Sequence, residues 1–330
     1  MHLTSSLLTI FLTGYLLYLG QNILIPFLIA LILTYLYLSV LTGLQKRLPN
    51  LFAIPLTIFL FLAVVWLIFF LIERNVTALI ASAPAYQQQF ESLTTKIFSH
   101  FKMDVPTTTN AFKQLNVGPL ISSIVFTFTN IAGQTGIIAV YFLFLCVEYQ
   151  YLPAKIAALP HQDRTMEMLK NISRQIQKYL RIKTVLSLFT GICSYLVLVS
   201  IGVDFADFWA LLIFLLNFIP TIGSIVATLF PCLLTLLQFD NLLPFFLVTT
   251  LLITLQFLTG NIIEPKVMGK HFNLSGLVIL LSLMFWGQIW GIVGMFLCVP
   301  LLMILSIALS HFPKTRPIAI LLSQDGNLDL

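Results

Sequence analysis

The chain has 330 residues, of which 59% are hydrophobic and only 9% are charged, whereas soluble domains carry about 25% charged residues. A mean hydropathy of +1.00 excludes an ordinary soluble domain, and the long continuous apolar runs favour membrane-spanning helices over the alternating strands of a barrel. The net charge of +5 is spread along the chain, so no dense basic patch points to a nucleic-acid partner.

The N-terminal part of the chain predicts three membrane-spanning helices followed by a segment outside the membrane. Apolar runs at 3–19, 23–44 and 51–72 are long enough, or nearly so, to cross a bilayer, and they make up an N-terminal unit of residues 1–74. Residues 75–119 are less apolar, and within them apolar residues recur at helical spacing with polar residues between them. This pattern predicts an amphipathic helix on the extracytoplasmic side.

The middle of the chain predicts a fourth span and a basic surface helix. Residues 120–147 form the span, and its first half carries serine, threonine, asparagine and glutamine, as expected for a helix that faces protein or water. Residues 148–183 are the most basic region, and four of their cations lie on one helical stripe opposite an apolar face. This arrangement is typical of a helix lying at the cytoplasmic membrane surface.

Residues 184–310 predict a transport core of two full spans, 184–201 and 242–259, each followed by a broken apolar run, 208–239 and 277–309. A proline flanked by polar residues interrupts the first run, and glycines with a glutamine interrupt the second. Irregular backbone survives in hydrocarbon only where protein or water covers it, and broken helices mark binding sites in transporters. The alternative is a kinked helix whose glycines only permit close packing.

The positive charges predict how these elements are oriented in the membrane. Thirteen of the 17 lysines and arginines lie on one side of the predicted spans, mostly within residues 148–183. The positive-inside rule then places both termini and the tail, residues 311–330, in the cytoplasm, and residues 75–119 outside. This placement of the charged segments is consistent along the chain only if each broken run returns to the side of the membrane from which it entered. The sequence therefore predicts an all-α polytopic membrane protein with about six full spans and two re-entrant hairpins of opposite orientation, the layout of an inverted repeat.

The tips of the two broken runs supply the predicted substrate-binding residues. Proline frees backbone carbonyl groups, and glycine lets a facing backbone approach closely. Amide side chains add hydrogen bonds without the cost of a buried charge, and tryptophan adds flat apolar walls. The predicted substrate-binding residues are Asn217, Pro220, Thr221, Gly223, Trp286, Gly287, Gln288, Gly291 and Gly294.

A polar connector before the second broken run supplies a candidate gate. Glu264 and Lys266 flank Pro265, and we expect these three residues to hold the cytoplasmic end of a mobile element. An ion pair between the two charges at a partly wet interface would contribute only ~1 kcal/mol or less, so its role would be conformational. No catalytic residue, metal site or cofactor is predicted, because the five histidines are scattered and no nucleotide-binding or nucleophile motif is present.

Three stretches together resemble the autoinducer-2 exporter family of bacterial membrane proteins. They are Asn-Phe-Ile-Pro-Thr-Ile-Gly at 217–223, Ile-Glu-Pro-Lys-Val-Met-Gly at 263–269, and the tryptophan- and glycine-rich run at 285–300. The resemblance covers residues 141–313 and implies a multi-span transporter of the bacterial inner membrane that forms a homo-oligomer. Where the family often has an aspartate this chain has Asn217, and where a proline often precedes the last broken segment it has Gly276.

Three functions stay open at this point. The first is a secondary transporter that exports a small polar solute through the lipid bilayer, such as the quorum-sensing signal autoinducer-2 that the resemblance implies. The second is a sodium or other cation/proton antiporter, which needs a carboxylate at depth; Glu264 is the acid within a family motif, and Asn217 weakens this reading. The third is a non-transporting membrane scaffold, which no motif supports. The absence of a nucleotide-binding motif favours secondary transport over an ATP-driven pump.

Overall fold

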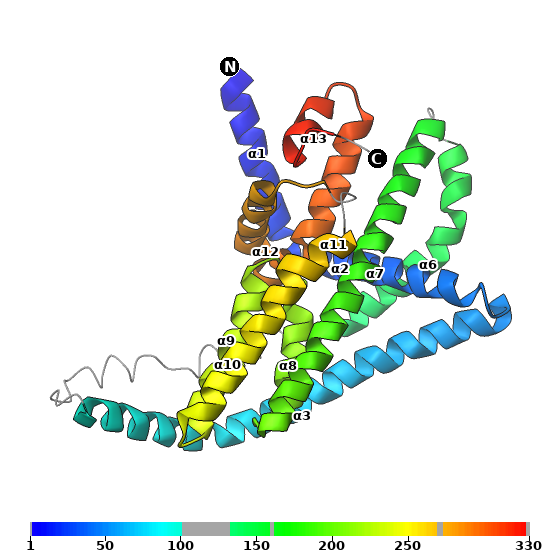
Figure 1. The fold of residues 1–330 in the computed structure, drawn as a ribbon. Coiled ribbons are helices and arrows are strands. Elements are labelled where there is room, and N and C mark those ends of the chain that lie inside the picture. Colours follow the sequence, from blue (N-terminus) through cyan, green and yellow to red (C-terminus); the bar gives the residue numbers. More distant parts are fainter. Residues whose placement is uncertain (1, 101–132, 159–161, 269–272, 328–330) are drawn as a thin grey trace.

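The computed structural model describes residues 2–100, 133–158, 162–268 and 273–327 (Figure 1). Over these ranges the chain is almost entirely helical and has no strand, which confirms the predicted all-α class. Six of the described helices are long and apolar enough to cross a membrane, which confirms a polytopic membrane protein. They are Gln21–Leu44, Asn50–Leu79, Thr135–Ala157, Asp163–Ile201, Leu242–Met268 and Gly276–His311.

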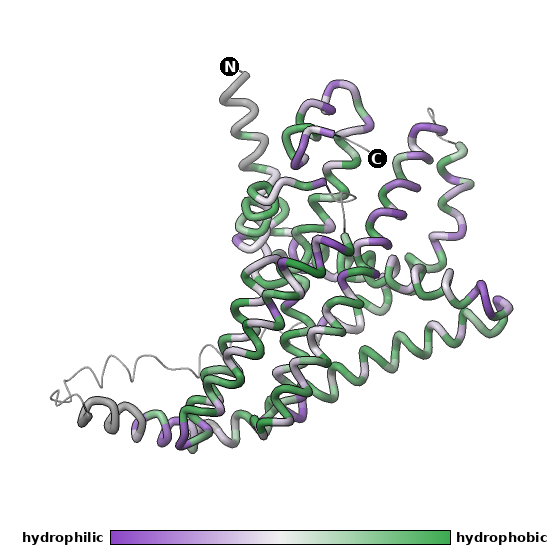
Figure 2. Tube along the Cα trace, viewed as in Figure 1, coloured by the Kyte–Doolittle hydropathy of each residue, from purple (hydrophilic) through white to green (hydrophobic). Residues whose placement is uncertain are grey.

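Hydrophilic residues gather at several helix ends, and they also follow the first half of α7. Figure 2 shows them at the corner between α2 and α3, at the end of the α6–α7 pair and around α13. Such a distribution suits helices whose middles lie in hydrocarbon and whose ends meet water.

The N-terminal part consists of α1 (His2–Leu19), α2 (Gln21–Leu44) and α3 (Asn50–His100). Helix α3 runs on for 51 residues, so the third span and the first part of the expected extracytoplasmic segment are one helix. The rest of that segment, 101–119, lies outside the described residues, as does the first part of the expected span at 120–147.

The basic region is divided between two helices, α6 (Thr135–Ala157) and α7 (Gln162–Ile201). Helix α7 is continuous over 40 residues, a length of about 60 Å. No proline or glycine interrupts it before Gly191, so the basic stripe and the fifth span form a single helix. Whether the basic part lies on a membrane surface stays a prediction.

The first broken run folds back on itself. Helices α8 (Ala206–Leu216) and α9 (Ile222–Gln238) pack against each other and are joined by the turn 217–221. We call them the first hairpin. It leaves the end of α7 and returns to the start of α10 (Leu242–Phe257).

The second broken run, α12 (Gly276–His311), folds back at Gly291, whose φ is 61° and ψ is −142°. Ser282 Oγ donates a hydrogen bond to the carbonyl oxygen of Cys298 at 3.4 Å. Sixteen residues of straight helix would separate these two positions by about 24 Å, so the two arms lie side by side. We call α12 the second hairpin.

The two hairpins open at opposite ends of α10. The first hairpin closes just before α10 begins, whereas the second follows α10, the π-helical segment η1 (Leu258–Ile263) and α11 (Glu264–Met268). Helix α13 (Arg316–Leu322) packs on α12. Figure 1 shows the two hairpins reaching toward each other in the middle of the molecule. The opposed arrangement agrees with the inverted-repeat layout; that the hairpins are re-entrant in a membrane stays a prediction.

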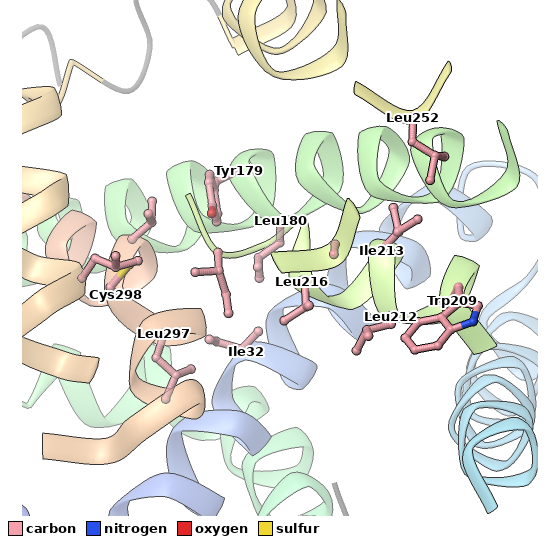
Figure 3. Packing of buried hydrophobic residues seen from close by; sticks show 14 of the residues in the cluster. Ile32, Tyr179, Leu180, Trp209, Leu212, Ile213, Leu216, Leu252, Leu297 and Cys298 are labelled. Atoms are coloured by element: carbon pink, nitrogen blue, oxygen red, sulfur yellow. The ribbon is translucent and has the colours of Figure 1, made fainter. Parts of the chain in front are cut away.

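The main hydrophobic core lies where these elements converge. Figure 3 shows Tyr179 and Leu180 of α7 near Leu216 of α8, with Leu297 of α12 nearby and Ile213 farther along α8. All five side chains are buried. A separate, smaller cluster joins α2, α3 and α6. Helix α7 is therefore the common support of both hairpins.

Candidate functional site

The tip of the first hairpin contacts the second arm of the second hairpin. The rings of Phe218 and Phe296 lie 5.0 Å apart between centroids. In the second tip, the ring centroids of Trp286 and Trp290 lie 4.5 Å apart. The indole N–H of Trp290 also donates a hydrogen bond to the carbonyl oxygen of Leu17 in α1 at 3.1 Å. The first tip therefore touches the second hairpin through Phe218 and Phe296, neither of them a predicted site residue, and α1 supports the second tip.

Both tips are held in backbone conformations that restrict side chains. Thr221 in the first tip has a φ of 58°, which residues other than glycine rarely adopt. At Gly223 an added Cβ would collide with the carbonyl oxygen of Leu216, and at Gly294 with that of Trp286. These glycines let the two arms of each hairpin approach at the turn. Strained backbone of this kind is concentrated at functional sites.

Asn217 is buried at the end of α8, with 5% of its surface exposed. Its Nδ2 donates a hydrogen bond to Ser187 Oγ of α7 at 3.0 Å. The neighbouring turn of α7 carries Gly191, where an added Cβ would lie 3.2 Å from the carbonyl oxygen of Ala210. Small residues therefore bring α7 and α8 close together, and the close approach places the amide of Asn217 on Ser187.

One helical turn from Ser187, Lys183 forms an ion pair with Glu264. The Lys183 Nζ and Glu264 Oε1 atoms are 2.6 Å apart, and the side chains are 4% and 24% exposed. From the sequence, we expected Glu264 to pair with Lys266. Lys266 is instead exposed, and the Glu264 carboxylate contacts Lys183 of α7. The pair is thus largely buried, and only its carboxylate end is partly open to solvent.

These contacts join into one polar cluster, which we call the central junction. Its five members come from three different elements: α7, the tip of the first hairpin, and the start of α11. Tyr179 belongs to it because it is buried one helical turn before Lys183 on the same face of α7. The members of the central junction are Tyr179, Lys183, Ser187, Asn217 and Glu264.

Buried polar atoms that lack a partner lie close to the central junction along the chain. Within the part of the chain that the structure describes, Thr184 Oγ1 and Gln256 Nε2 are buried without a hydrogen-bond partner. Thr184 follows Lys183 directly, and Gln256 precedes Glu264 by two turns on the same continuous helix. Unpaired buried polar groups are costly, so these atoms are available to bond a ligand or water.

The predicted site residues do not all converge. Asn217 and Glu264 belong to the central junction, whereas Gln288 and Thr221 are exposed. In the second tip, the ring of Trp286 lies next to that of Trp290. Gly291 is at the fold-back and Gly294 lies against Trp286 of the other arm, so these glycines do not line a surface that faces the first tip. The remaining predicted residues are placed as follows: Pro220 in the first turn, Gly287 against Met295, and Pro265 with Lys266 on the exposed side of α11.

Sequence reasoning missed Lys183, Ser187 and Tyr179. Lys183 was grouped with the surface cations because it ends the basic run, although it also stands at the start of an apolar span. The spacing Tyr179, Lys183, Ser187 places all three on one helix face. A lysine on that face, directly before an apolar helix, was the feature of the sequence that could have indicated a buried cation.

Comparisons with known proteins agree on one family. The sequence model described as AI-2E family transporter matches residues 6–314. A provisionally named transport protein of Haemophilus influenzae is 32% identical over 320 residues, which cover 92% of this chain and 91% of the relative. The AI-2 transport protein TqsA of Escherichia coli is 36% identical over 207 residues, covering 62% of this chain and 59% of TqsA.

Proposed function

We infer that this chain, which belongs to the AI-2E transporter family, is a secondary transporter that exports a small, neutral, hydroxyl-rich solute. Autoinducer-2 is the solute we propose, because the relative TqsA is named as an AI-2 transport protein. A bacterial inner membrane is the proposed location. The observation that carries the proposal is the central junction, where α7, the tip of the first hairpin and the start of α11 bring polar groups together.

The chemistry of the central junction suits a neutral solute with several hydroxyl groups. Asn217 offers an amide and Ser187 a hydroxyl, both buried, and neither carries a charge that would have to be desolvated. Movement of the first hairpin away from α7 would break the Asn217–Ser187 hydrogen bond and leave both groups ready for a solute. Thr184 and Gln256, which lie close to junction members along the chain, add unpaired buried polar atoms.

The solute site is tested by transport in sealed proteoliposomes with isotope-labelled autoinducer-2. Asn217→Ala removes the amide and leaves the buried Ser187 hydroxyl unpaired, so we expect solute binding to weaken by about 1–3 kcal/mol. Asn50→Ala is the matched control, because Asn50 is exposed at the start of α3. Wild-type vesicles that move no solute would refute the proposed substrate. Unaltered binding in Asn217→Ala would place the site elsewhere.

Cation/proton antiport is the second candidate, and Glu264 favours it. A carboxylate in the transport core could exchange a cation for a proton, and Glu264 is both part of the core and partly open to solvent. Proton movement driven by an imposed sodium gradient, in vesicles without autoinducer-2, distinguishes this function. The Asn217→Asp variant should strengthen such antiport if the chain retains the capacity.

The proposed orientation places both termini in the cytoplasm and opens the hairpins to opposite sides. Single cysteines at Asp240, which follows α9, and at His311, which ends α12, would report it. Membrane-impermeant labels should reach Asp240→Cys from outside and His311→Cys from inside. Access to both from one side would refute this topology.

A further inference from the structure

The Lys183–Glu264 pair connects α7 to the segment that leads into the second hairpin. Lys183 is 4% exposed and Glu264 is 24% exposed, so water reaches the carboxylate end of the pair more readily than the ammonium end. Ser187, one turn further along α7, holds the tip of the first hairpin through Asn217. Two consecutive turns of α7 therefore contact the elements that must move relative to each other.

Glu264 directly follows the π-helical segment η1. Its backbone N–H bonds to the carbonyl oxygen of Thr259, five residues earlier, so one residue more than in an α-helix is held in that turn. Returning this turn to α-helical pairing would rotate all that follows by about 100°. Glu264 would then point away from Lys183. The π-helical segments of other proteins are often found at functional sites, and here the ion pair directly follows such a segment.

We infer that the Lys183–Glu264 pair is the proton-coupling element of transport, an inference that rests on the proposed function. A proton from water binds Glu264 Oε1 and forms an O–H bond, while Lys183 keeps its own proton. The pair thereby gains one positive charge and loses its mutual attraction. A buried ammonium without a partner is costly, so Lys183 and Glu264 separate and η1 returns to α-helical pairing. Loss of the same proton to the opposite side of the membrane restores the pair, which moves one proton per cycle.

Few other titratable groups face the pair from the described elements around it. Tyr179 is buried one turn before Lys183 on the same face of α7, and α11 adds Lys266, which is exposed. The tip of the first hairpin contributes Asn217, which does not titrate. Glu264 is therefore the carboxylate that the described contacts place beside Lys183.

Hydrogen exchange of residues 256–268 in lipid nanodiscs tests the switch without any solute. After correction for the intrinsic pH dependence of exchange, wild-type protection should fall as the pH is lowered. Glu264→Gln should exchange about 100-fold faster at every pH, because it leaves Lys183 without its partner. Glu148→Gln is the matched control, since Glu148 pairs with Lys155 in an exposed ion pair, and it should follow the wild type.

A double variant guards against a trivial loss of folding. Lys183→Met with Glu264→Gln removes both charges, so no unpaired ammonium stays buried. We expect it to recover protection and to show no dependence on pH. Wild-type protection that does not change with pH, or equal protection in wild type and Glu264→Gln, would overturn the inference.

A transport measurement separates failure of this inference from failure of the proposed function. Proteoliposomes carrying a trapped pH dye receive an imposed gradient of labelled autoinducer-2. The wild type should move solute and shift the internal pH together, and Glu264→Gln should lose the pH shift. Wild-type vesicles that move no solute would refute the proposed substrate, whereas solute movement without a pH shift would refute the coupling.

Discussion

Replacing Gly223 by alanine tests how closely the two arms of the first hairpin approach. The added methyl group would overlap the carbonyl group of Leu216 on the opposite arm. Backbone cannot move aside as the end of a flexible side chain can, so the tip must open. Forcing one extra methyl group into close-packed structure costs about 1–3 kcal/mol, and occasionally more. We expect Gly223→Ala to lower the free energy of unfolding by at least about 2 kcal/mol, measured by unfolding of the detergent-solubilised protein and followed by tryptophan fluorescence.

Gly136 provides the matched control for this experiment. It lies within α6, and no atom comes within 4 Å of an added Cβ. Alanine is favoured over glycine inside a helix by up to about 1 kcal/mol, so Gly136→Ala should be neutral or slightly stabilising. Gly294→Ala should resemble Gly223→Ala, because its methyl group would overlap the carbonyl group of Trp286. Equal unfolding of Gly223→Ala and Gly136→Ala would refute the close approach of the arms.

Two further predictions concern single polar contacts. Asn217→Ala and Ser187→Ala should each lower the free energy of unfolding by about 1–3 kcal/mol. Because the amide and the hydroxyl bond each other, the double variant should lose less than the sum of the two. Additive effects in the unfolding assay would contradict this contact. Hydrogen bonds from the Asn327 backbone N–H and then from the Asn273 side chain lower the pKa of Asp325 below its ordinary value of 3.8. These hydrogen bonds therefore contribute fully to the stability of the tail above the ordinary pKa, and their contribution is lost as the pH falls through the lowered pKa. Amide exchange in the tail should quicken only in strong acid, and Asp325→Asn should abolish that step.

The sequence predicted two of the five members of the central junction. Asn217 and Glu264 were singled out because each lies in a short irregular stretch beside apolar helix, and local interruptions of this kind depend on nearby residues alone. Their partners are 30 and 81 residues away along the chain. Nothing local distinguishes Ser187 from other serines in apolar helices, and Lys183 closes a run of cations that suits a membrane surface equally well.

The amino-acid sequence by itself determined the membrane class, the positions of most helices and the two places where apolar runs break. These properties follow from composition, from apolar run length and from proline and glycine, all of which act within a few residues. Only the tertiary structure decided that Glu264 pairs with Lys183 rather than with Lys266, that Asn217 bonds α7, and that Gln288 faces outward. Such choices depend on how distant helices pack, and close approach at Gly191 and Gly223 sets the register between them.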